Sequence, residues 1–168
     1  GYHGYWGLDF LNVDPHLGTN QDFKDFVTAA HQAGIKVVLD VVSNHTSDVI
    51  TYKDGVAYIP QGSEKVKNPD FLNKLSNYHN KDSTFDCESH IKGNFYGLDD
   101  IATENPEVVQ GFIDIWSYWI KNFDIDGLRI DTFRHVNSQF WKAVIPSIQK
   151  VAVDQGKKSF DIFGEVHD

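Results

Sequence analysis

Two charged side chains lie in a segment with the pattern of a strand, residues 127–131 (GLRID), where apolar residues alternate with Arg129 and Asp131. An extended chain points alternate side chains to one face, so both charges should share a face. An unpaired buried charge costs several kcal/mol, and Arg129 is therefore expected to pair with Asp131 and favour its ionised form. A second strand-like segment, residues 160–165, ends in Glu165. Carboxylates at the ends of successive strands are the groups that glycoside hydrolysis needs.

The segments around these residues predict an alternation of helices and strands. Helical patterns cover residues 19–34, residues 105–123 with Asn105 as the capping residue, and a third segment from Val136 to Val151. Short apolar runs at residues 35–42, 127–131 and 160–165 predict strands, the first of them buried and parallel. This order predicts right-handed crossovers and a parallel sheet.

A long polar segment interrupts the alternation after the first predicted strand. From Thr46 to about Gly97 no helical period is sustained, and the segment is too long for an ordinary connection. We expect an inserted subdomain with irregular structure and short strands. The predicted division is 1–45, 46–102 (the insert) and 103–168.

Composition excludes several classes of protein. The chain has 168 residues and a net charge of −9, which argues against nucleic acid as a partner. Its single cysteine, Cys87, excludes an internal disulfide framework and a multi-cysteine metal site. No apolar run is long enough to span a membrane. The chain contains no methionine, so we expect a piece cut from a longer protein.

Three polar clusters fall at the ends of the three predicted strands: Asp40/Asn44/His45, Arg129/Asp131/His135 and Glu165/His167. In parallel α/β folds this edge of the sheet carries the active site. Three such ends, each with a carboxylate, predict one catalytic site.

These segments resemble the signature motifs of the α-amylase family of glycoside hydrolases. The motifs are DVVSNH at 40–45, GLRIDTFRH at 127–135 and FGEV at 163–166, and the segments YHGYW at 2–6 and LDDIATENPEV at 98–108 resemble two more. The family fold is a (β/α)8 barrel with a subdomain inserted after the third strand. The resemblance therefore implies an α/β fold, a partial TIM barrel with strands three to five and a small irregular insert.

The resemblance also implies catalytic roles. Asp131 matches the nucleophile of a retaining glycosidase, and Glu165 matches the general acid/base, for which we expect a raised pKa. The family's third acid comes from a later strand that lies outside the 168 residues. The chain alone is therefore expected to be inactive.

Further residues match the family's binding positions. His3, Tyr5, Trp6, Asp40, His45, Arg129, Arg134 and His135 match substrate-binding or site-supporting positions, and Arg134 stands where many relatives carry lysine. The side chains of Asn44 and Asp100, with the His135 carbonyl, match ligands of a structural calcium, a cation that takes about 6–8 oxygen ligands. Three tryptophans in the helical segments, Trp116, Trp119 and Trp141, are expected in the core.

The implied activity is cleavage of α-1,4-glucosidic bonds, with an α-glucan or maltooligosaccharide as substrate and no protein partner evident. A transglycosylase or cyclodextrin-forming enzyme is the alternative within the same chemistry, and a non-catalytic glycan-binding relative is a further one. An α/β metal or nucleotide protein lacks support, because no Gly-rich phosphate loop and no close histidine pair is present. The compartment stays open, although starch degradation is compatible with an extracellular or periplasmic site.

Overall fold

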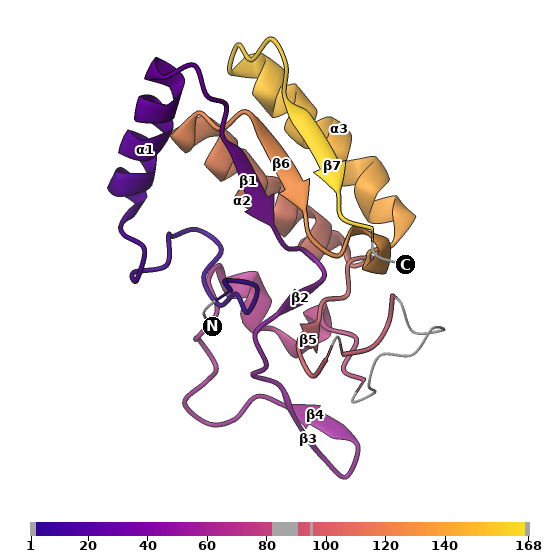
Figure 1. The fold of residues 1–168 in the computed structure, drawn as a ribbon. Helices are drawn as coiled ribbons and strands as arrows, with labels where there is room; N and C mark the ends of the chain where they lie inside the picture. The colour runs from indigo at the N-terminus through magenta and orange to yellow at the C-terminus, as the bar shows by residue number, and fades with distance from the viewer. Residues whose placement is uncertain (1–2, 82–90, 95, 167–168) are drawn as a thin grey trace.

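The computed structural model describes residues 3–81, 91–94 and 96–166. The described residues do not include Tyr2 of the segment at 2–6, Cys87, His167 or Asp168. Figure 1 shows a small parallel sheet with helices along it and an irregular part below the carboxyl ends of the strands. The sheet consists of β1 (Val38–Val41), β6 (Gly127–Ile130) and β7 (Asp161–Gly164) in the order β1-β6-β7.

The predicted parallel sheet is confirmed. Its register determines which side chains of neighbouring strands lie side by side. Asp40 pairs with Arg129, which in turn pairs with Phe163, so these side chains form one row across the sheet. The strand predicted at 35–42 was expected to be buried, which holds for Val37 and Val41 but not for Val38, which is 41% exposed. Phe163 on the other edge strand is 53% exposed. The reason is that α2 and α3 pack against one face of the sheet, and Val38 and Phe163 point from the opposite face, which is more exposed.

Local capping chemistry defines the helices. Helix α1 (Asn20–Gln32) begins at Thr19, which forms a capping box with Asp22, and Gly34 beyond its end has a φ of 74°. Helix α2 (Pro106–Phe123) is capped by Asn105, as predicted. Helix α3 (Ser138–Asp154) begins later than predicted. Val136 belongs to the turn before it, which contains the 3-10 helix η3 (Phe133–His135).

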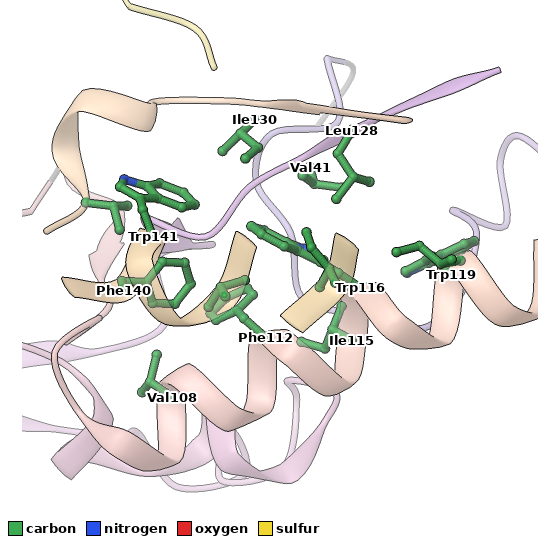
Figure 2. Close-up of a cluster of buried hydrophobic side chains, with 14 of the residues drawn as sticks. Val41, Val108, Phe112, Ile115, Trp116, Trp119, Leu128, Ile130, Phe140 and Trp141 are labelled. Carbon is green, nitrogen blue, oxygen red and sulfur yellow. The ribbon is translucent and has the colours of Figure 1, made fainter. Parts of the chain in front are cut away.

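The core lies between the sheet and the two helices behind it (Figure 2). Leu128 and Ile130 of β6 are fully buried there, which confirms that the apolar and charged residues of this strand face opposite sides. Trp116 is 1% exposed, and Trp119 and Trp141 are each 8% exposed. The three helical tryptophans are therefore core residues, as predicted.

The inserted part contains little regular structure. Strand β2 (His45–Thr46) pairs with β5 (Asp99–Asp100), and β3 (Thr51–Lys53) forms a hairpin with β4 (Val56–Tyr58). Two 3-10 helices, η1 (Asp70–Asn73) and η2 (Leu75–Asn77), lie between the hairpin and β5. Short strands in an irregular segment agree with the expectation, and the boundaries at 46 and 102 stay a prediction. None of the helices in the described ranges is both long and apolar enough to cross a membrane.

Candidate active site

The ends of β6 and β7 bring Asp131 and Glu165 to the same edge of the sheet. Each residue directly follows its strand, and the backbone continues the parallel ladder at both positions. The Asp131 N–H donates to the Val41 carbonyl at 2.8 Å, and the Glu165 N–H donates to the Ile130 carbonyl at 2.8 Å. The backbone thus holds both carboxyl groups at one level, at the carboxyl end of the sheet.

The Arg129 guanidinium joins the carboxylates of three strands. Its Nη1 donates to Asp40 Oδ1 and to Asp131 Oδ1, each at 2.9 Å. Its Nη2 lies 3.1 Å from Glu165 Oε1. Fixed fork geometry lets one arginine contact several carboxylate oxygens at once. The structure therefore brings the carboxylates of Asp40, Asp131 and Glu165 together around one cation.

Arg129 lowers the pKa of Asp131 as expected, but the net shift of this pKa is upward. Burial raises the pKa of Asp131, and a hydrogen bond and the negative charge of Glu165 raise it further, against the lowering effect of Arg129. Arg129 remains charged: burial lowers its pKa, but the hydrogen bonds to Asp40 and Asp131 outweigh this and raise it. The upward shift has two causes beyond Arg129: the Asp131 side chain is only 10% exposed, and the Glu165 carboxyl lies beside it.

The Glu165 side chain has a second partner that the sequence did not indicate. The backbone N–H of Thr132 donates to Glu165 Oε2 at 3.3 Å. Thr132 adopts a left-handed conformation (φ 49°, ψ 35°), which turns the chain out of β6 into η3. A β-branched residue rarely adopts this conformation, so no local pattern predicts it.

The N-terminal loop covers one side of this network. The Tyr5 hydroxyl donates to Asp40 Oδ2 at 2.9 Å. The His3 ring stacks on Tyr5 at 5.7 Å and meets Trp6 edge-on at 4.5 Å, and Trp6 is 49% exposed. An accessible aromatic group beside carboxylates suits a sugar ring, which presents an apolar face and a rim of hydroxyls.

His45 has a different environment from the other predicted sugar contacts. It is buried, and its Nε2 lies 3.2 Å from the Tyr5 carbonyl. Burial lowers the pKa of His45 to about 4, so the ring is neutral at neutral pH, and Nε2–H donates to the carbonyl. His45 thereby holds the loop that carries Tyr5. On η3, Arg134 is exposed and His135 is half-buried.

The calcium ligands implied by the resemblance gather around β2 and β5, where Asn44 and Asp100 are both buried. Asp100 Oδ2 accepts from the Gly93 N–H at 2.7 Å and contacts His79 Nδ1 at 2.6 Å. Both contacts are to Oδ2, so among the described residues Oδ1 remains for a cation. The neighbouring residues Asn80 and Asn94 each have a buried amide oxygen without a hydrogen-bond partner. Neutral amide oxygens with one carboxylate are ligands of the kind calcium takes, so this chemistry fits the ion.

The types of ligand at this place suit calcium, but the described residues do not form a complete ligand shell. Within the described ranges no group of three His, Cys, Asp or Glu side chains could hold a metal. Burial lowers the pKa of His79, but hydrogen bonds to Asp100 and Glu104 outweigh this and raise it. His79 therefore competes for the Asp100 carboxylate, a contact that no motif in the sequence indicates.

Comparison with known proteins identifies the family. A family model described as the α-amylase catalytic domain matches residues 2–162. The chain is 38% identical over 210 residues to an α-amylase of Streptomyces lividans, covering 99% of this chain and 23% of that protein. It is 32% identical to the intracellular maltogenic amylase of Bacillus subtilis, covering 98% of this chain and 26% of that protein. The chain thus spans about a quarter of the length of these curated relatives.

Comparison with solved structures identifies the same family. The α-amylase of Geobacillus thermoleovorans, complexed with acarbose, matches 100% of this chain and 34% of its own with 38% identity and a TM-score of 0.78. An Anoxybacillus α-amylase matches 100% of this chain and 33% of its own with 35% identity and a TM-score of 0.79. The parallel sheet with its irregular insert is accordingly part of a (β/α)8 barrel, as the motifs implied. This chain belongs to the α-amylase family.

Proposed function

We propose that the protein carrying this chain is a retaining glycosidase that cleaves α-1,4-glucosidic bonds of starch-like glucans. The observation that supports this most directly is the single guanidinium of Arg129, which contacts the carboxylates of Asp40, Asp131 and Glu165. One of these carboxyls is a candidate nucleophile and another a candidate acid, which is the pair that retaining glycoside hydrolysis uses.

The proposed reaction has two steps. An Asp131 oxygen attacks the anomeric carbon while Glu165 gives its proton to the glycosidic oxygen, which leaves as a hydroxyl. Glu165, now ionised, takes a proton from water, and the resulting hydroxide displaces Asp131 from the sugar with net retention. Arg129 stabilises the carboxylates as their charges change. His3, Tyr5 and Trp6 present rings to the sugar, Arg134 and His135 complete the binding side, and the buried His45 supports it by holding the loop that carries Tyr5.

Substitution of the two carboxyls tests the proposal. The assay uses the longest natural gene product that carries this chain, with maltooligosaccharides as substrates. Asp131→Asn should abolish hydrolysis, and Glu165→Gln should reduce kcat by about 10²- to 10⁴-fold. Asp154→Asn is the matched control, because its exposed carboxylate pairs only with Lys150 on α3 among the described residues. Undiminished turnover by Asp131→Asn refutes the assignment of the nucleophile.

A transglycosylase is the second candidate, because one relative with 29% identity is a cyclomaltodextrin glucanotransferase of Klebsiella oxytoca. The glycosyl–Asp131 ester would then react with a sugar hydroxyl in place of water. Chromatography of the products distinguishes the two: linear short sugars indicate hydrolysis, and cyclic or lengthened products indicate transfer. A non-catalytic glycan-binding protein has less support, since both carboxyls are present, and binding without any turnover would indicate it.

We also propose a structural calcium ion at the junction of β2 and β5, held by the side chains of Asn44 and Asp100 and by the His135 carbonyl. The bound ion would tie the insert to the end of β6. Calcium binding measured by calorimetry on the chelator-treated protein, and a rise in Tm on adding the ion, test this without any activity assay. Asp100→Asn should weaken both effects, and binding unchanged by this substitution would exclude Asp100 as a ligand.

A further inference from the structure

Gly164 precedes Glu165 and lies against an aromatic ring. A methyl group built on its Cα would lie 2.6 Å from Phe133 Cβ and 2.7 Å from Phe133 Cδ2, well inside contact distance. The φ of Gly164 is not in the left-handed region. Glycine is therefore required here because the Phe133 ring packs on the backbone, and not because of backbone conformation.

Phe133 is held from its other side by Trp141 of α3. The two rings stack with centroids 4.4 Å apart and an interplanar angle of 11°. Trp141 Nε1 donates to the Phe133 carbonyl at 3.3 Å, so the backbone of η3 is fixed as well as the ring. Trp141 in turn stacks on the buried Trp116 of α2 at 6.3 Å. Figure 2 shows Trp141 at the end of the core next to Ile130, beneath the turn that follows β6.

This packing joins the two elements that position the Glu165 carboxyl. One is the end of β7, whose Gly164 contacts Phe133. The other is the turn after β6, whose Thr132 N–H reaches Glu165 Oε2 at 3.3 Å. Phe133 directly follows Thr132, so a shift of its ring moves both the donor and the strand that carries the acceptor.

We propose that Phe133, packed between Trp141 and Gly164, is a positioning residue for Glu165. It sets the separation between the turn after β6 and the end of β7, and thereby keeps the Glu165 carboxyl on the Thr132 N–H and on Arg129. This inference rests on the proposed role of Glu165 as the general acid/base. Phe133 touches neither substrate nor reacting atoms in this scheme and acts through Glu165.

The test compares two substrates that need the acid to different degrees. Cleavage of maltotetraose needs a proton on the leaving oxygen, whereas fluoride leaves α-maltosyl fluoride without one. In the full-length gene product, Phe133→Leu removes the stacked ring, and Gly164→Ala pushes the ring away. Each should lower kcat on maltotetraose by about 10- to 100-fold, as expected for a displacement of the order of an ångström. The KM should stay near its original value, and turnover of the fluoride should be largely retained.

Two controls separate positioning from general damage. Phe133→Tyr keeps the stacked ring and should restore the natural ratio of the two activities. Phe26→Leu, at an exposed position on α1, should leave both activities unchanged. A Tm within a few degrees of the parent protein and an altered pH profile of kcat on maltotetraose should accompany Phe133→Leu.

The outcomes distinguish the two levels of inference. If Glu165→Gln spares the fluoride and Phe133→Leu lowers both activities equally, or neither, the positioning role is refuted while the proposed function stands. If Glu165→Gln itself shows no preference for the fluoride, the acid/base assignment fails, and the positioning role fails with it. A selective loss in Phe133→Leu and Gly164→Ala, restored in Phe133→Tyr, supports the inference.

Discussion

The inserted part is organised around a buried ion pair, and removal of its lysine should loosen this part selectively. Lys67 Nζ lies 2.6 Å from Asp99 Oδ2, and the two side chains are 3% and 0% exposed. The ammonium also donates to the Tyr78 hydroxyl at 3.1 Å and lies 4.3 Å above the centre of that ring. Asp99 accepts in addition from the N–H groups of Val49 and Ile50. The pair thereby connects β5 to the segment that leads into β3.

Replacement of one partner leaves the other charge buried, which costs about 3–5 kcal/mol in proteins. In Lys67→Met, Asp99 keeps its two backbone hydrogen bonds, so we expect the lower part of that range. The double variant Lys67→Met/Asp99→Asn removes the uncompensated charge and should be less destabilised than Lys67→Met alone, because replacing both members of a buried pair is often nearly neutral.

Native-state hydrogen exchange is a suitable assay, because it reports opening of the insert separately from unfolding of the sheet. The opening free energy at the Val49 and Ile50 amides should fall by about 3 kcal/mol in Lys67→Met. The matched control is Lys74→Met, whose ion pair with Glu107 is half exposed, at 54% and 44%. Solvent screens this exposed pair, so its loss should change the opening free energy much less than the loss of Lys67. Equal effects of the two substitutions would refute the argument that burial determines the difference.

Three further predictions follow from named contacts. Despite partial burial, the Val37 N–H and His31 lower the pKa of Asp126, so Asp126 stabilises the fold above its unfolded pKa of about 3.9. This stability is lost as the pH falls through the lower pKa of the folded state. Asp126→Asn should reduce the free energy of unfolding by about 1–3 kcal/mol at pH 7 and make it depend less on pH in the acid range. Burial raises the pKa of Asp131, so kcat/KM should fall at acid pH with a midpoint above about 3.9. Arg129→Gln removes a contact that lowers the pKa of Asp131 and should move this midpoint to higher pH. Gly111→Ala places a methyl group 2.8 Å from Phe71 Cδ1 and should cost about 1–3 kcal/mol by overpacking.

Each of these has a clear contrary result. The first fails if Asp126→Asn has the same pH dependence of unfolding as the parent protein, measured by urea titration from pH 3 to 8 or thereabouts. The second fails if the midpoint for Arg129→Gln moves to lower pH. The third fails if Gly111→Ala is as stable as the parent; the double variant with Phe71→Leu should recover part of the loss by making room.

Local sequence determined the secondary structure and the placement of the polar residues. Thr19 and Asn105 cap their helices at the start of the ranges predicted from the sequence, because a cap depends on groups within one helical turn. The alternation in residues 127–131 likewise decided which side chains of β6 enter the core. The motifs at the strand ends predicted the barrel family, which the comparisons confirm.

Tertiary structure alone decided the properties that depend on distant parts of the chain. The raised pKa of Asp131 depends on burial and on a carboxyl from another strand, and the Lys67–Asp99 pair joins residues 32 positions apart. The contact of Phe133 with Gly164 likewise requires β7 to lie beside the turn after β6. Helix caps and strand alternation depend on neighbours along the chain, which can be seen in the sequence. Burial, charge pairing and ring packing depend on neighbours in space, which only the folded structure defines.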